Sequence, residues 1–491
     1  MALVRSASLA FGVVINVAVS FVVFSFLDLL DRALCYVYRA ADYMIESEWK
    51  PCYCSSPLEA IDGGGGGSSI LVTGQGEPAK VVRLSSSRLQ LEDVSDTLYS
   101  RPPLVADVSK ATIRRLSRGG GGGGSGSCSP VRPCHKARTG RPGLRVSSDI
   151  VEMLKGRIVG MKPQPSPRWS DCSCKVCTSW TASTAKSLFV RSAGAKAAGM
   201  EEDVIFIHGF ISSSRFWSET VYPNLSETAK STRRFFAVDL LGFGRSPRPT
   251  DSLYTLSEHV EMIEKSVLDT HKVKSFHVVA HSLGCILALA LAVRHPQSVK
   301  SLTLLAPPYY PVPEGEVAKS QYVMRKVAPR RVWPLIAFGA SIASWYEHIS
   351  RTVCLLICKN HRLWEFLHKL LSINSIPMFL LEGFFCHTHD AAWHTLHNVI
   401  CGTAGKIDGY LDTVNDSMKC EVNIFHGEHD ELIPLECSYN VQRKVPRAKV
   451  RVVEKEDHIT VLVGREKAFV TELERIWNGS DSSVINGHQE S

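Results

Sequence analysis

Four short motifs between residues 206 and 460 carry residue types suited to acyl transfer through a serine. In the first, residues 278–284, an apolar run leads to Ser282, with a small residue two positions before it and another two positions after it. At a tight turn from strand to helix, such a serine projects its hydroxyl at the edge of a sheet, and small neighbours avoid collisions in the crowded turn. Ala280 stands where the commonest form of this motif has glycine. We therefore predict Ser282 as a nucleophile.

The second motif, residues 206–210, ends a predicted strand with His208 and Gly209. In hydrolases with this kind of serine turn, the loop after that strand supplies one backbone N–H of the oxyanion hole, and the residue after the nucleophile supplies the other. We predict that these two amides belong to Phe210 and Leu283. The position of His208 beside Gly209 favours a structural role for its imidazole over a role as the base.

The acid and the base are predicted in the two remaining motifs. Asp430 follows the predicted strand 421–425, and His458 lies between the last predicted strand and the last predicted helix. The order serine, carboxylate, histidine along the chain is the order found in hydrolases with this kind of serine turn. His458 would take the proton of the Ser282 hydroxyl, and Asp430 would fix the imidazole tautomer. This chemistry needs no metal and no cofactor.

Other carboxylates near these motifs are weaker candidates for the acid. Glu428, Glu431 and Glu436 are less well placed than Asp430, and we expect them to be solvated. Asp239 follows an earlier strand, a position that supplies the acid in some hydrolases. The glycines that follow it favour a role in stabilising their turn.

The elements that would position these motifs begin near Trp169, where short β-branched runs start to alternate with amphipathic segments. This alternation is typical of a mainly parallel sheet flanked by helices, so the predicted class is α/β, in the form of an α/β hydrolase. We predict strands at 187–191, 203–207, 234–238, 275–280, 300–305, 421–425 and 449–453. We predict helices at 256–271, 284–295, 435–444 and 463–477.

The alternation stops in an insert at about 307–418, which is helical, apolar and rich in aromatic side chains. The insert lies between two predicted strands, where hydrolases of this class carry a lid. Most of its aromatic side chains would form the lid's own core, and a minority would face a substrate groove. The hydrolase domain is therefore predicted at 169–478, with a disordered tail at 479–491.

The segment 1–54 is predicted to be a signal or a membrane anchor with its adjoining stretch. No charged residue occurs from Ser6 to Leu27, a run that would rise about 33 Å as a helix and could cross a bilayer. Because Arg5 precedes this run, we expect the rest of the chain to enter the secretory pathway and to lie outside the cell or in the cell wall. A buried core helix is disfavoured because nothing nearby could pack around it. Cleavage and retention at the plasma membrane both stay open.

Residues 55–168 have the composition of a largely disordered linker. They contain the glycine runs 63–67 and 119–124 and a proline-rich stretch at 162–167, which bury too little apolar surface to fold. The net charge of +8 is mild and comes largely from the N-terminal third. Such a surplus in a solvated segment gives no reason to expect a nucleic-acid partner.

Fifteen cysteines occur in the chain, and several of them cluster in polar surroundings. Cys172, Cys174 and Cys177 have the spacing of metal ligands, but zinc would need a fourth ligand from elsewhere. In an oxidising compartment we favour disulfides for such thiols.

Residues 186–478 resemble α/β hydrolases of the lipase, esterase and epoxide-hydrolase grouping. A more specific resemblance, to the plant BODYGUARD family, is carried by residues 47–54, 169–172, 280–285, 306–310 and 344–351. That family is associated with the epidermal cell wall and cuticle and is described as lysophospholipases or cutin-forming hydrolases. The resemblance implies a hydrolase or acyltransferase that acts on lipid-like acyl esters.

Two rival interpretations are weighed against this one. Epoxide hydrolases and dehalogenases use aspartate at the position of Ser282, so these activities are disfavoured. A non-catalytic receptor or scaffold could use the same fold, because a fold alone does not determine activity. The presence of all three triad residues argues against it.

Overall fold

The structure, a computed structural model, describes nine stretches of the chain: residues 2–46, 69–72, 80–83, 95–99, 168–181, 187–194, 202–249, 252–371 and 377–479. Most of the predicted linker and the predicted tail beyond Gly479 lie outside these residues. The described parts of the linker are β1 (Ser69–Val72), which pairs antiparallel with β2 (Lys80–Arg83), and the short helix η2 (Asp96–Tyr99).

A seven-stranded sheet in the order β3-β5-β4-β6-β7-β8-β9 forms the centre of the molecule. Its strands are β3 (Val190–Ala193), β4 (Glu202–Ile207), β5 (Arg234–Val238), β6 (Ser275–His281), β7 (Val299–Leu305), β8 (Glu421–Gly427) and β9 (Lys449–Val453). β3 is antiparallel to β5, and all other neighbours in this sheet are parallel. The predicted α/β-hydrolase class is confirmed.

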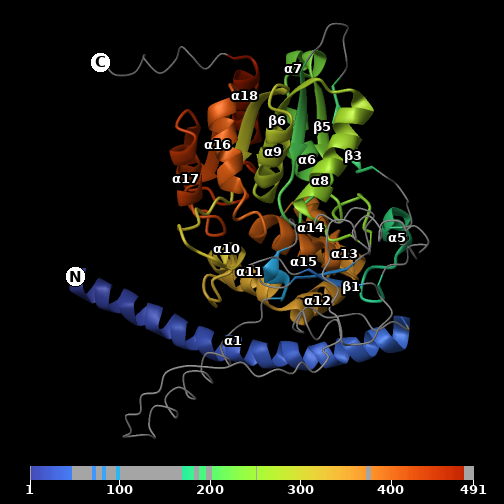
Figure 1. Cartoon of the computed structure of the whole chain (residues 1–491), viewed down its shortest axis with the longest axis vertical. Helices are drawn as coiled ribbons and strands as arrows, with labels where there is room; N and C mark the ends of the chain where they lie inside the picture. The colour runs from blue at the N-terminus through green and yellow to red at the C-terminus, as the bar shows by residue number, and fades with distance from the viewer. Residues whose placement is uncertain are drawn as a thin grey trace, which may run out of the picture.

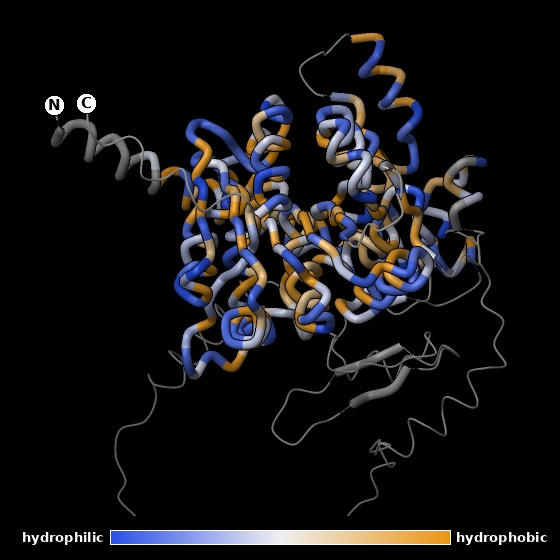
Figure 2. Tube along the Cα trace, turned by 90° about the horizontal axis from the view of Figure 1, so that it is seen from above, coloured by the Kyte–Doolittle hydropathy of each residue, from blue (hydrophilic) through white to orange (hydrophobic). Residues whose placement is uncertain are grey.

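Helices cover both faces of the sheet (Figure 1). On one face lie α8 (Leu256–Ile263), continued by the π-helical turn η4 (Glu264–Asp269), α9 (Leu283–Arg294), α16 (Ile407–Ser417) and α17 (Glu436–Lys444). On the other face lie α6 (Arg215–Thr220), η3 (Tyr222–Asn224), α7 (Glu227–Thr232) and α18 (Glu466–Trp477). Apolar positions are concentrated between these layers, and many of the outward turns are hydrophilic (Figure 2).

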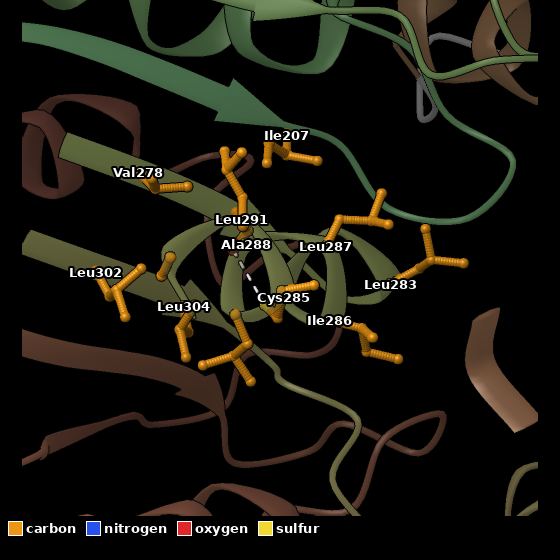
Figure 3. Packing of buried hydrophobic residues seen from close by; sticks show 14 of the residues in the cluster. Ile207, Val278, Leu283, Cys285, Ile286, Leu287, Ala288, Leu291, Leu302 and Leu304 are labelled. Carbon is orange, nitrogen blue, oxygen red and sulfur yellow. Dashed lines mark hydrogen bonds between the residues drawn. The ribbon is translucent and has the colours of Figure 1, made fainter. Parts of the chain in front are cut away.

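The helix α9 is the best buried of these elements and follows β6 directly. Its residues from Leu283 to Ala292 are all buried. In Figure 3, Ala288 and Leu291 of this helix lie close to Val278 of β6 and Leu302 of β7. This packing holds the N-terminus of α9 firmly against the sheet, at the turn that contains Ser282.

The insert between β7 and β8 forms a layer of helices beyond the carboxyl ends of the strands (Figure 1). It contains α10 (Lys319–Val327), α11 (Leu335–Trp345), α12 (Glu347–Leu356), α13 (His361–Leu370), α14 (Met378–Phe385), α15 (His389–Thr395) and the π-helical η5 (Leu396–Cys401). An isolated β-bridge between Phe243 and His387 joins this layer to the loop after β5. The next helix, α16, packs with the core of the sheet instead.

The N-terminal helix α1 (Ala2–Glu46) runs along the insert on the side away from the sheet (Figure 1). It is long and apolar enough to cross a membrane. Its side chains Phe24, Leu27, Cys35 and Tyr38 are nevertheless buried against the rest of the molecule. The expectation that nothing could pack around the N-terminal run is therefore wrong for its last turns, because the lid supplies the missing partner.

Candidate active site

Ser282 occupies a strained turn between β6 and α9. Its backbone angles are φ 52° and ψ −123°, a region that residues with a side chain rarely adopt. The Ser282 amide donates to the Leu305 carbonyl at 2.8 Å, which fixes the turn against β7. A Cβ atom on Gly284 would lie 2.6 Å from the Ile207 carbonyl oxygen, so the small residue lets α9 approach β4. The turn predicted from residues 278–284 is present.

Asp430 and His458 form a buried hydrogen-bonded pair. His458 Nδ1 donates to Asp430 Oδ2 at 2.7 Å. Asp430 Oδ1 accepts from the amides of Leu432 at 2.9 Å and Ile433 at 2.8 Å. Burial opposes ionisation of Asp430, but hydrogen bonds from His426 and His458 outweigh it and hold the pKa of Asp430 below its usual value. Because Asp430 holds the proton of His458 on Nδ1, the Nε2 atom of His458 is free to accept a proton.

A second histidine joins this pair to the serine turn. His281 Nε2 donates to the His458 carbonyl oxygen at 2.9 Å, and the two rings lie 4.6 Å apart. Burial and the nearby His458 lower the pKa of His281 to about 3, so His281 is neutral at pH 7. Because His281 immediately precedes Ser282, this hydrogen bond brings the loop of His458 to the serine.

The loop after β4 completes the surroundings of the serine. A Cβ atom on Gly209 would lie 3.1 Å from the Ser282 Cβ, so this loop passes directly beside the serine. The Leu240 amide donates to His208 Nε2 at 3.0 Å, which leaves the proton on Nδ1 to be donated to the Gly209 carbonyl at 2.7 Å. Burial lowers the pKa of His208 and keeps it neutral. These contacts connect the loop of Gly209 to the loop after β5 through the His208 imidazole.

The two amides predicted for the oxyanion hole belong to segments next to this serine. Leu283 is the first residue of α9, where a backbone N–H has no partner within the helix. Phe210 follows Gly209, and its ring packs edge-on against Phe243 at 6.1 Å. Their role in holding an oxyanion stays a prediction.

The weaker candidates for the acid have other contacts. Asp239 Oδ1 accepts from the Ser214 amide at 2.6 Å, and its Oδ2 accepts from the Arg245 amide at 2.7 Å. Its carboxylate thus braces the glycine turn after β5. Glu428 is exposed and accepts from the Lys455 amide at 3.0 Å.

Two histidines at this site were missed in the sequence. His426 Nε2 lies 3.4 Å from Asp430 Oδ2, and its Nδ1 lies 2.6 Å from Ser438 Oγ. His281 contacts the loop of His458, as described above. Each lies in the strand that leads to a predicted triad residue. Their closeness in sequence to Ser282 and Asp430 could have identified them as site residues.

The prediction of disulfides for the polar cysteines is wrong for those cysteines that the structure describes. Among the described residues no two cysteines are joined by a disulfide. Cys172, Cys174 and Cys177 instead gather around His361. Cys52, Cys54, Cys128 and Cys134 lie outside the described residues.

Comparisons with known proteins identify families and structures that are similar to this chain. Residues 204–464 match the alpha/beta hydrolase fold family. "Probable lysophospholipase BODYGUARD 3" of Arabidopsis thaliana is 54% identical over 97% of this chain and 99% of its own length. "Probable lysophospholipase BODYGUARD 1" of the same plant is 53% identical over 96% of this chain and 98% of its own length. Among solved structures, MenH from S. aureus is 17% identical over 59% of this chain and 98% of its own, with a TM-score of 0.42.

Proposed function

The chain belongs to the BODYGUARD family of α/β hydrolases, and from that premise we propose that it is a serine-dependent hydrolase of carboxylic esters with lipid-like acyl groups. The observation that carries the proposal is the hydrogen bond between His458 and Asp430 beside the strained turn of Ser282. The names of the relatives favour lysophospholipids as the substrate class.

In the proposed reaction, Ser282 Oγ attacks the ester carbonyl while His458 Nε2 takes its proton. Asp430 keeps the imidazole in the required tautomer and stabilises the charge that forms on it. The amides of Phe210 and Leu283 hold the oxyanion. His458 then protonates the departing alcohol, and the acyl group stays on Ser282. Water activated by His458 releases the acid.

A fluorophosphonate probe tests this proposal directly, because it labels only an activated serine. The parent protein should be labelled at Ser282, and Ser282→Ala should not be labelled. Ser231→Ala, at an exposed position outside the Asn-x-Ser sequons, is the matched control and should be labelled like the parent. Absence of labelling together with absence of ester hydrolysis in the folded parent would favour a non-catalytic receptor or scaffold.

Transfer of the acyl group to an alcohol is a second candidate reaction for the same intermediate. Ser282, Asp430 and His458 are 7%, 8% and 9% exposed, and exclusion of water favours attack by a bound hydroxyl. Hydroxylated fatty acceptors would fit a role in cutin formation at the epidermal wall. A labelled acyl donor with rising concentrations of a hydroxy-fatty acceptor measures the partition. Free acid as the only labelled product at saturating acceptor would exclude transfer.

We further propose that α1 is kept as a membrane anchor. Cleavage after the apolar run would remove Phe24 and Leu27, which are buried in one cluster with Trp345 and Tyr346 of the lid. Large apolar side chains are exposed on α1 and on the adjoining segment that leads into α11, among them Val17, Phe21, Val22, Phe26, Trp333 and Leu335. A membrane would cover this surface.

Expression in a cell with a secretory pathway tests this placement. The intact N-terminus should be found in the mature protein, and alkaline carbonate should leave the protein in the membrane fraction. Asn415 and Asn478, both exposed in Asn-x-Ser sequons, should carry glycans that a glycosidase removes. A mature chain that begins beyond Leu27 would contradict retention, and an unglycosylated cytosolic protein would contradict export.

A further inference from the structure

Three cysteines and one histidine from distant parts of the chain converge beside the lid. Cys172 and Cys174 precede the short helix α5 (Lys175–Thr181), Cys177 lies in it, and His361 begins α13. Their ligand atoms all lie within 4.8 Å of one another. The triad does not use this group, which is built on the segment before the sheet and on the lid.

The distances fit the edges of a tetrahedron around one ion. His361 Nε2 lies 3.6 Å from Cys174 Sγ and 3.7 Å from Cys177 Sγ. For zinc, bonds of about 2.3 Å to sulfur and about 2.0 Å to nitrogen at the tetrahedral angle give a sulfur-to-nitrogen edge of about 3.5 Å. A single ring nitrogen forms one hydrogen bond along its lone pair or its N–H, so two sulfurs at nearly equal distance are better explained by a shared centre.

The surroundings of the four side chains are those of metal ligands. His361 Nδ1 lies 2.9 Å from Glu365 Oε1, one turn along α13. Such a carboxylate holds the proton on Nδ1 and turns the Nε2 lone pair toward the metal. The Cys174 amide donates to Cys172 Sγ and the Cys177 amide to Cys174 Sγ, each at 3.5 Å. These amide bonds stabilise negative charge on sulfur.

We propose that Cys172, Cys174, Cys177 and His361 form a structural site for Zn²⁺. Three thiolates and one imidazole are a preferred zinc ligand set, and four protein ligands close the coordination sphere to substrate. His361 is the fourth ligand that the sequence spacing lacked. Bound zinc would also keep these thiols from forming disulfides.

The site would fasten the segment 168–181 to the lid. The helix α5 has only seven residues, too few to be stable alone. The same segment carries Arg168, which forms ion pairs with Asp42 of α1 at 3.1 Å and with Asp390 of α15 at 2.9 Å. The metal would therefore stabilise a junction between α1, the segment before the sheet, and the lid.

Metal content of the purified full chain tests the proposal. After expression with zinc and removal of loosely bound ions, the parent should hold one zinc ion per chain more than His361→Ala and Cys174→Ser. His368→Ala, on the same helix, and Cys420→Ser, a buried cysteine elsewhere, are the controls and should match the parent. A second group, Cys354, Cys358 and His387, could also hold a metal ion. Because that group is intact in all of these variants, the difference in zinc content between the parent and each variant reports only on the site of His361.

Two measurements on the parent keep the test decisive if a variant fails to fold. Co²⁺ exchanged into the parent should give the intense visible bands of tetrahedral coordination and a thiolate charge-transfer band. Peptides with Cys172, Cys174 and Cys177 should resist alkylation until a chelator is added. Equal zinc in the parent and in folded ligand variants, or a disulfide between two of these cysteines in the parent, would overturn the site. Ser282→Ala should keep its zinc, so a failure of the proposed catalysis leaves this inference standing.

Discussion

Asp42 of α1 and Arg351 of α12 form a bidentate ion pair across 309 residues of sequence. The two nitrogen-to-oxygen distances are 2.8 and 2.7 Å, and each residue is 4% exposed. The Arg351 guanidinium also lies over the Tyr38 ring, 4.5 Å from its centre. The N-terminal helix is therefore held to the lid by a contact that solvent does not screen.

Asp42→Asn should lower the free energy of unfolding by about 3–5 kcal/mol, because it leaves the buried charge of Arg351 without its partner. Equilibrium denaturation in a mild detergent measures this change. Glu314→Gln removes an exposed carboxylate and should change stability by less than about 0.5 kcal/mol. A loss no larger than that of the control would show that α1 is not held as described.

Ser282→Ala, Asp430→Asn and His458→Ala should each reduce kcat for an ester substrate by about 10⁴-fold or more. The double variant Ser282→Ala/His458→Ala should lose no more than about the larger single loss, because the residues act as a unit. Circular dichroism checks that each variant is folded. Near-parental activity of Asp430→Asn would refute its assignment and move the acid to Asp239.

Gly284→Ala should reduce activity by about 100-fold or more, because its new Cβ would press against the Ile207 and His208 carbonyls and displace the start of α9. Gly409→Ala is the matched control, since a Cβ at this position in α16 meets nothing within 4 Å. That variant should keep full activity and gain about 0.5–1 kcal/mol of stability. Equal activity of the two variants would contradict the close approach of α9 to β4.

The docking of α1 should weaken as pH rises. Burial opposes a charge on His348 of α12, but hydrogen bonds with Asp31 and Cys35 of α1 outweigh it and raise its pKa from 6.5 to about 10. A raised folded-state pKa stabilises the fold fully below pH 6.5, and this contribution disappears as pH rises toward 10. Stability of the parent should therefore fall more steeply over this range than that of His348→Gln. Parallel curves would show that His348 does not titrate with docking.

The strands and the triad motifs could be predicted because each is recognised from a short stretch of sequence. Ser282, Asp430 and His458 each follow a β-branched run within a few residues, and parallel strands bring such strand ends to one edge of the sheet. The bounds of β4 to β9 lie within two residues of the prediction for the same reason, since burial leaves a mostly apolar run. The strand predicted at 187–191 is instead β3 at Val190–Ala193, a partly exposed edge strand without such a run.

The remaining features depend on contacts that no local pattern reveals. The helix α1, which contains the predicted membrane span, also packs on the lid, through Phe24 and Leu27 within the span and through Asp42 and Arg351 beyond it. His361 lies 184 residues beyond Cys177, so the spacing of the cysteines alone could not supply it. His281 was passed over because its contact with the His458 carbonyl oxygen appears only when β6 and the last loop are brought together.

The separation between α1 and its partner has a consequence for how the chain is made. Helix α1 leaves the ribosome before the lid, and Arg351 follows Asp42 by 309 residues. At about 5–20 residues per second, this is an interval of roughly 15–60 seconds. During that interval the apolar side chains of α1 have no lid to pack against. A membrane or a chaperone must shelter the helix until the lid is synthesised, and a helix already held in a bilayer would guide the finished lid to the membrane surface.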